Sequence, residues 1–227
     1  MINNQKISIV IPAYNEEDII GCTLNNLTFS WIDQIIVVND GSSDNTKNII
    51  QKYKVELLDL KENCGKGNAI NQGILETCGD IILIIDADLG ESVVEIEKLI
   101  EPLIDREAKV EFTIAVLPII GGGLGFVRKL ADISLKYLIG ENMRAPLSGQ
   151  RAFKRDVLEK IYPLREGFGL EMGINIALFK NNIKFEEVDC EFQHRITKQS
   201  FSGYIHRSKQ FLDIIKSIWE MKKSNYV

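Results

Sequence analysis

Short aliphatic runs alternate along this chain with longer stretches of helical period, and this order constrains the fold more than any other feature. The pattern is typical of βαβ units, so it predicts an α/β fold with a mainly parallel central sheet flanked by helices. Most of the predicted strands are nearly continuous Ile, Leu and Val, as expected where both faces of a sheet are covered. The first five strands are expected at residues 6–11, 34–39, 55–60, 80–85 and 110–117. Helices are expected at 16–28, 43–53, 66–77 and 92–104.

The second half of the chain continues with a less regular series. We expect, in order, a helix to about residue 138, a strand near 148–153, a helix near 170–181, a strand near 184–192 and a last helix from about 203. No repeat or linker interrupts the series, so residues 1–227 are expected to form one domain.

Charge is unevenly distributed along the chain. The formal net charge is −5, but residues 194–227 carry 7 Lys and Arg against 2 Asp and Glu. The acidic body argues against a nucleic-acid partner, whose phosphates would require many basic groups. The four cysteines are scattered and are expected to be reduced thiols. Because neither a signal peptide nor a membrane-spanning run is evident, the expected location is the cytoplasm.

Polar and acidic residues follow the predicted strands at their carboxyl ends, which is where an open α/β sheet binds its ligands. Asp86 and Asp88 follow one such strand, and alternation along an extended chain would send both carboxylates to one side. Two carboxylates suit Mg²⁺ or Mn²⁺ held together with the oxygens of a substrate diphosphate. For an isolated pair, the alternative is a loop that ends a strand and caps the next helix.

Four ordered motifs in the first ninety residues resemble the GT-A glycosyltransferases of family 2 type: IPAYNEE, VVNDGSSDNT, NCGKGNAINQG and DIILIIDADL. The resemblance implies a GT-A fold in which residues 1–90 bind the nucleotide-sugar. Taken alone, the NDG segment would more often be only a turn, and the lysine of the GKG segment could be a solvated residue at a helix start. By position, the implied nucleotide-sugar contacts are Pro12, Ala13, Asn15, Glu16, Asp40, Gly41, Lys66, Asp86, Ala87 and Asp88.

The segments APLSGQRAF, GFGLE and His194-Arg195 resemble bacterial transferases related to glucosyl-3-phosphoglycerate synthase. This resemblance implies that residues 110–200 bind sugar and acceptor, with His194 completing a metal site begun by Asp86 and Asp88. It places Glu171 near the sugar. Without it, His194 and Arg195 could be ordinary surface residues. The implied acceptor contacts are Ser148, Gly149 and Arg151, and the implied catalytic residues are Asp88, Glu171 and Arg195.

The expected activity is metal-dependent transfer of a hexose, most simply glucose, from a UDP-sugar to a hydroxyl acceptor. Relatives with the GLE and late-histidine pattern retain the anomeric configuration, so retention is favoured, although Glu171 could instead serve as the base of an inverting enzyme. IPAYNEE and DADL also resemble polyprenyl-phosphate glycosyltransferases that act at a membrane surface. The remaining alternatives are a nucleotidyltransferase and a non-catalytic nucleotide-sugar-binding protein.

The last helix, expected over 203–223, has an apolar stripe and several lysines. Such a helix could contact an anionic membrane surface peripherally, pack on the core, or form an oligomer contact such as that of a homodimer.

Overall fold

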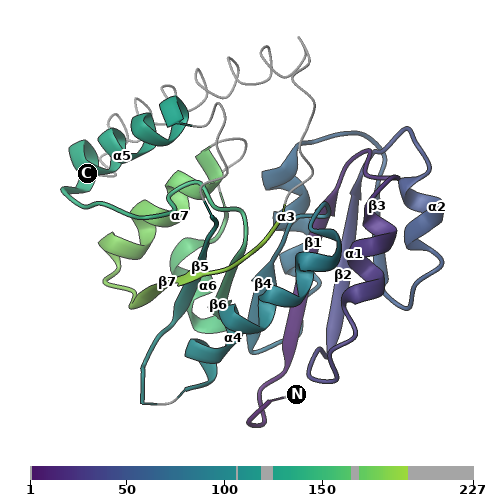
Figure 1. The fold of residues 1–227 in the computed structure, drawn as a ribbon, viewed down its shortest axis with the longest axis horizontal. Helices are drawn as coiled ribbons and strands as arrows, with labels where there is room; N and C mark the ends of the chain where they lie inside the picture. Colours follow the sequence, from purple (N-terminus) through teal and green to yellow (C-terminus); the bar gives the residue numbers. More distant parts are fainter. Residues whose placement is uncertain (1, 106, 119–124, 165–168, 194–227) are drawn as a thin grey trace.

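The computed structural model describes residues 2–105, 107–118, 125–164 and 169–193, and these form a seven-stranded sheet covered by helices (Figure 1). The strands are β1 (Ile7–Ala13), β2 (Gln34–Asp40), β3 (Glu56–Leu60), β4 (Ile81–Ile84), β5 (Phe112–Val116), β6 (Arg151–Lys154) and β7 (Phe185–Asp189). The helices are α1 (Ile20–Asn26), α2 (Thr46–Ile50), α3 (Lys66–Leu75), the 3₁₀ helix η1 (Gly90–Glu95), α4 (Ile96–Ile104), α5 (Gly125–Ile139), α6 (Arg155–Ile161) and α7 (Gly169–Lys180).

The strand order is β3-β2-β1-β4-β6-β5-β7. Neighbours β3, β2, β1 and β4 are parallel, and β5 and β7 are parallel to each other. Only β6 runs against its neighbours β4 and β5 among the strands described. The prediction of an α/β fold with a mainly parallel sheet flanked by helices is therefore confirmed.

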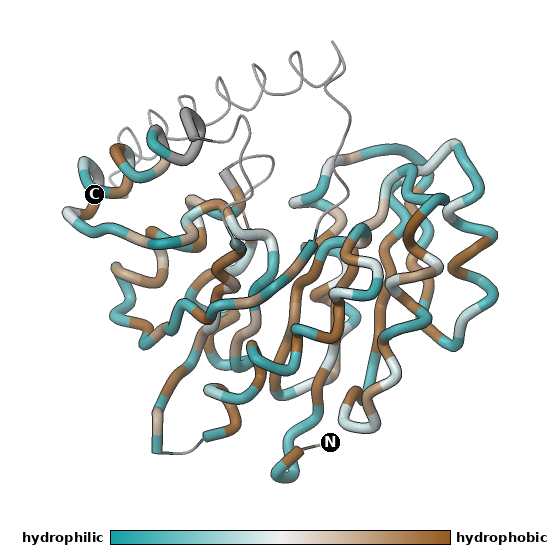
Figure 2. Tube along the Cα trace, in the orientation of Figure 1, coloured by the Kyte–Doolittle hydropathy of each residue, from teal (hydrophilic) through white to brown (hydrophobic). Residues whose placement is uncertain are grey.

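Alternate residues of the strands face two separate hydrophobic layers. In β1, Ile7, Ile9 and Ile11 pack with α1, η1 and α4, whereas Val10 packs with α3 on the opposite face. Helices α5, α6 and α7 extend the second layer over β5 and β6. Because both faces are covered, the strands at the centre of the molecule are strongly hydrophobic along their length (Figure 2).

Several predicted boundaries were wrong for local reasons. The first helix begins at Ile20 rather than at residue 16, because Asn15 has a left-handed φ of 56° and residues 17–19 form turns. The helix predicted from residue 92 begins as the 3₁₀ helix η1, and α6 was not predicted. The strand predicted near 148–153 begins only at Arg151, since residues 146–150 form a turn and a loop. The last predicted helix lies outside the described residues.

The antiparallel direction of β6 decides which loops meet. Because Ile84 pairs with Arg151 and Ile81 with Lys154, the amino end of β6 lies beside the carboxyl end of β4. The loop that precedes β6 therefore reaches the same edge of the sheet as the loops that follow β1, β2 and β4. Within the part of the chain that is described, no helix has both the length and the apolarity to span a bilayer.

Candidate functional site

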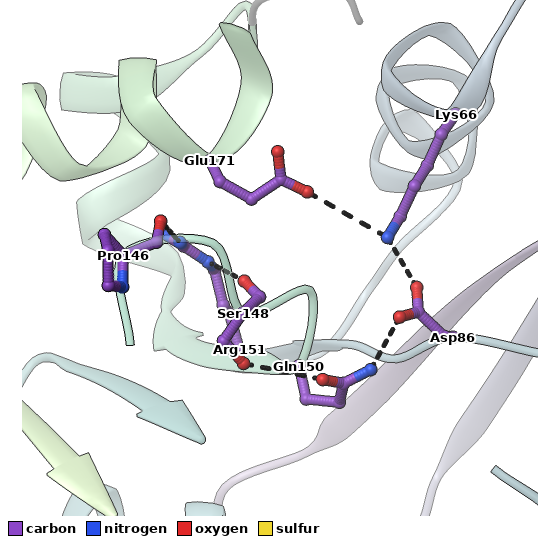
Figure 3. Close-up of polar contacts among 7 residues, drawn as sticks. All are labelled: Lys66, Asp86, Pro146, Ser148, Gln150, Arg151 and Glu171. Atoms are coloured by element: carbon purple, nitrogen blue, oxygen red, sulfur yellow. Dashed lines mark hydrogen bonds and ion pairs between the residues drawn. The ribbon is translucent and has the colours of Figure 1, made fainter. Parts of the chain in front are cut away.

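Three charged side chains from separate elements meet at this edge of the sheet (Figure 3). Lys66 is the first residue of α3, Asp86 lies just past β4, and Glu171 lies in the first turn of α7. The Lys66 Nζ is 2.5 Å from Oδ1 of Asp86 and 4.0 Å from Oε1 of Glu171. A single ammonium group thus links the first half of the chain to the second.

The loop before β6 packs against this ion pair and donates a hydrogen bond to it. Gln150 is completely buried, and its Nε2 donates a 2.7 Å hydrogen bond to Oδ2 of Asp86. A Cβ on Gly149 would lie 2.8 Å from both Asp86 Oδ2 and Lys66 Nζ, which is closer than such atoms approach. The pair therefore rests directly on the glycine backbone, and a side chain at this position would displace it.

Arg151 points away from the ion pair into the protein. The residue is 1% exposed, and its guanidinium donates to the carbonyl oxygens of Ser148 and Pro146 and to Oδ1 of Asn175. Asn175, on α7, also donates to the carbonyl of Pro146 at 2.8 Å. This buried network joins the loop before β6 to the helix that carries Glu171.

Burial and charge shift the pKa values of these groups. Burial raises the pKa of Glu171, although the charges of Lys66 and Arg151 act in the opposite direction. Desolvation lowers the pKa of Arg151 to about 10, with Glu171 opposing the change. Desolvation also acts to lower the pKa of Lys66, but Asp86, Glu171 and Asp88 outweigh it, so that pKa is raised. Lys66 consequently remains charged at neutral pH.

The loops after β1 and β2 are joined by hydrogen bonds. Asn15 accepts from the main-chain N–H of Ser43 and donates its own N–H to the hydroxyl of Ser42. The N–H of Glu16 donates to Oγ1 of Thr46 at 2.8 Å. These contacts hold the first motif against the second, so that Asn15 and Glu16 are positioned before any ligand binds.

Asp40 organises the next loop along the edge. Its two carboxylate oxygens accept the main-chain N–H groups of Cys64 and Gly65 at 2.8 and 2.9 Å, and the residue is 3% exposed. Gly41 and Gly65 have φ of +65° and +90°, and a Cβ on Gly41 would lie 2.5 Å from the carbonyl carbon of Glu62. Both glycines therefore occupy backbone conformations that other residues rarely adopt.

Asp88 lies on the wall of a cavity of about 540 Å³ formed with η1, α1 and residues that follow β7. The Ser92 hydroxyl accepts the N–H of Gln193, and Glu95 accepts the N–H of Glu191. The chain immediately before His194 is therefore tied to the helix that follows Asp88. His194 and Arg195 themselves lie outside the described residues.

Asp86 and Asp88 provide oxygen ligands of the kind that Mg²⁺ and Mn²⁺ take. The contact between Lys66 and Asp86 shows that positive charge is already accommodated at this point. No cluster of three or more His, Cys, Asp or Glu side chains suited to a metal occurs among the described residues. A pair of carboxylates of this kind is compatible with a divalent cation that takes its remaining ligands from elsewhere.

The structure brings together some of the residues predicted from sequence and separates others. Gly149 lies beside Lys66 and Asp86, and Glu171 lies 4.0 Å from Lys66. Ser148 is buried, with its hydroxyl 3.4 Å from Oε1 of Gln150, and the Arg151 side chain is turned into the core. Pro12 and Ala13 end β1, and Ala13 is buried. Ala87 is also buried, and its carbonyl accepts from Thr23.

Sequence reasoning missed Gln150 and Asn175. Gln150 was visible only as a neighbour of Gly149 in the PLSGQR segment, and Asn175 only as a polar residue in an apolar helix.

A family model described as glycosyl transferase family 2 matches residues 8–162. Among curated proteins, a poly-beta-1,6-N-acetyl-D-glucosamine synthase of Staphylococcus aureus is 43% identical over 88 residues, covering 36% of this chain and 21% of that protein. A dolichyl-phosphate beta-glucosyltransferase of Trichomonas vaginalis is 38% identical over 109 residues, covering 40% of this chain and 32% of that protein. The chain thus spans a third or less of these relatives.

Solved structures match over much more of the chain. Glucosyl-3-phosphoglycerate synthase of Mycobacterium tuberculosis with Mn²⁺, UDP and phosphoglyceric acid has a TM-score of 0.77 at 25% identity, covering 95% of this chain and 79% of that one. The same enzyme with Mg²⁺ and UDP has a TM-score of 0.73 at 26% identity, with coverage of 90% and 76%. The same enzyme with Mn²⁺, UDP-glucose and phosphoglyceric acid has a TM-score of 0.76 at 25% identity, covering 95% of this chain and 80% of that one.

Proposed function

The chain belongs to glycosyl transferase family 2, and on that premise we propose that it transfers a hexose, with glucose the first candidate, from a UDP-sugar to a hydroxyl acceptor. The observation that carries this proposal is the meeting of Lys66, Asp86 and Glu171 at the carboxyl edge of the sheet. Matching structures of a glucosyl-3-phosphoglycerate synthase contain UDP or UDP-glucose with Mn²⁺ or Mg²⁺, which supports the same donor class here.

The nucleoside would lie along the loops after β1 and β2. Asp40 already accepts two main-chain N–H groups, but each carboxylate oxygen has two lone pairs, so it can also accept the N–H of a uracil. Pro12, Ala13 and Asn15 would line the same groove, with Glu16 accepting from the ribose hydroxyls and Gly41 allowing close approach. These loops are pre-positioned, so binding would require little ordering.

Lys66 would face the diphosphate. Its ammonium sits on a flexible four-carbon stem and is the cation nearest to Asp86 among the described residues. We place Asp86, Asp88 and His194 around an Mg²⁺ or Mn²⁺ ion. When bound, such an ion stabilises the negative charge that develops on the departing diphosphate. Lys66, together with Arg195, would add to that stabilisation.

Glu171 would orient the donor sugar. It is buried between Lys66 and Arg151, and the Arg151 network fixes the helix on which it lies. We favour retention of the anomeric configuration, with the diphosphate accepting the acceptor proton and Glu171 holding the sugar hydroxyls. The anomeric proton coupling of the product, measured by NMR, tests this assignment, and the opposite anomer would instead make Glu171 a candidate base.

The acceptor would approach from the loop that carries Ser148 and Gly149. The matching synthase structures contain phosphoglyceric acid, so an acceptor with phosphate or carboxylate is the first to test. Because the Arg151 guanidinium is held by protein carbonyls and Asn175, we now propose that it positions this loop and does not contact the acceptor.

A screen of nucleotide-sugars tests the donor without knowledge of the acceptor. A donor that binds only the folded protein raises its melting temperature. We expect UDP-glucose with Mn²⁺ to raise Tm, and we expect Asp86→Ala to remove that increase. Equal stabilisation of both proteins would contradict the site. Turnover of the stabilising donor then distinguishes an enzyme from a nucleotide-sugar-binding protein.

A polyprenyl-phosphate acceptor is a second candidate, because one curated relative is a dolichyl-phosphate glucosyltransferase. The basic segment 194–227 would then meet anionic lipid. Co-sedimentation with anionic and neutral liposomes tests this candidate, and equal recovery with both would argue against it. The nucleotidyltransferase alternative is not retained, because the matched family consists of glycosyl transferases.

A further inference from the structure

The most closely packed polar contact of the site joins two groups that the proposed function assigns to different tasks. Lys66 would bind the diphosphate and Asp86 would bind a divalent cation, yet their side chains are 2.5 Å apart. We propose that Lys66 takes the place of the divalent cation at Asp86 until a nucleotide diphosphate draws it away. Metal binding to the protein alone would therefore be weak, and metal and nucleotide would strengthen each other's binding.

The surroundings of Asp86 require Lys66 and the divalent cation to compete for one carboxylate oxygen, Oδ1. Oδ2 is held by the buried amide of Gln150, so the carboxylate cannot rotate freely, and Oδ1 is the oxygen in contact with Lys66. Gly149 lies so close that a Cβ would collide with both partners. A cation that approached Oδ1 would meet the ammonium directly, and like charges at such short range repel strongly.

Lys66 is able to leave this position. Its side chain is 39% exposed, and it is the first residue of α3, so only its own flexible stem has to move. A diphosphate offers negative oxygens that can replace Asp86 as its partner. Once Lys66 has moved, its ammonium no longer opposes a cation at Oδ1, while Gln150 still holds the carboxylate in place.

The exchange implies a reciprocal free-energy coupling between the two ligands. Manganese affinity can be measured by the loss of the free Mn²⁺ signal in electron paramagnetic resonance, first without and then with UDP. We expect Lys66→Met to bind Mn²⁺ alone about 10-fold more tightly than the wild type does, within the usual range of such couplings. We also expect UDP to tighten Mn²⁺ binding less in the variant than in the wild type.

Two controls separate the exchange from a general charge effect. Lys66→Arg keeps a cation beside Asp86 and should bind Mn²⁺ alone as weakly as the wild type. Lys47→Met removes a comparable ammonium from a different ion pair, 2.7 Å from Asp59, and should leave Mn²⁺ affinity unchanged. If Lys66→Met fails to fold, Lys66→Gln offers the same loss of charge with a polar side chain.

The inference rests on the proposed function, but the measurements tell their failures apart. Unchanged or weaker Mn²⁺ binding by the neutral Lys66 variants overturns the exchange, even if UDP binds as proposed. Failure of UDP to bind the wild type with Mn²⁺ overturns the proposed donor, while the metal-only comparison still decides the role of Lys66.

Discussion

In the first half of the chain, the polar residues of the site lie on loops at the ends of parallel strands and are held by main-chain hydrogen bonds between loops. In the second half, they are buried between the sheet and α7. Asn15 and Glu16 illustrate the first arrangement, whereas Gln150, Arg151 and Asn175 illustrate the second. Surface loops tolerate the loss of a polar side chain better than a buried network does. Substitutions in the first half should therefore affect mainly binding, and those in the second half stability.

The largest effect on turnover is expected at Asp88, which lies in the first half of the chain and is proposed to bind ligand. Asp88→Asn removes a charge proposed to hold the cation and diphosphate, so kcat should fall by about 10²- to 10³-fold. The melting temperature should stay close to that of the wild type, because the side chain is only half-buried. Wild-type turnover of this variant, or a large loss of its stability, would contradict the claim that substitutions in the first half affect mainly binding.

Arg151 provides the opposite case. Arg151→Met would leave the carbonyl of Ser148 and the side-chain oxygen of Asn175 without their buried donor, while the carbonyl of Pro146 would keep its hydrogen bond from Asn175. The free energy of unfolding should fall by about 3 kcal/mol, as measured by urea denaturation. The matched control is Lys47→Met, whose exposed ion pair with Asp59 should be worth about 1 kcal/mol or less. Equal losses in the two variants would refute the assigned difference.

Gly149 belongs to the second half of the chain but lies against Lys66 and Asp86 of the first half, so its substitution should affect both binding and stability. Gly149→Ala introduces a methyl group 2.8 Å from Lys66 Nζ and Asp86 Oδ2, and the flexible ends of these side chains must move. We expect turnover to fall by about 10-fold, with a stability loss of about 1 kcal/mol. A variant with unchanged turnover would show that the ion pair can shift without consequence for the reaction.

The smallest effect concerns Glu171 and depends on pH. Because its pKa in the folded protein is raised above the ordinary value of 4.5, the wild type loses stability as pH rises from 4.5 through the folded pKa. Glu171→Gln cannot ionise and avoids that loss. Thermal unfolding should show the variant more stable than the wild type at pH 7, with the difference shrinking toward pH 4. A constant difference across this range would argue against a penalty for ionising Glu171.

Much of the nucleotide-binding half could be predicted from the sequence. Asp40 ends one strand, and Lys66 and Asp86 come shortly after two others, in a chain where strands and helices alternate. Parallel topology sends the carboxyl ends of such strands to one edge of the sheet. The first residues of α1 and η1 could not be predicted, because where these helices begin depends on hydrogen bonds between loops. The hydrogen bond from the N–H of Glu16 to Thr46 is one example.

By itself, the sequence determined the α/β architecture, the aliphatic strands and the acidic edge, since hydrophobic periodicity and the succession of strands and helices along the chain are local properties. Only the tertiary structure decided that Gln150 holds Asp86, that Arg151 turns inward to Asn175, and that Lys66 lies between Asp86 and Glu171. The physical reason is the reversed direction of β6. Its pairing with β4 and β5 brings a loop some sixty residues distant to the edge built by the first motifs, and no local pattern encodes that pairing.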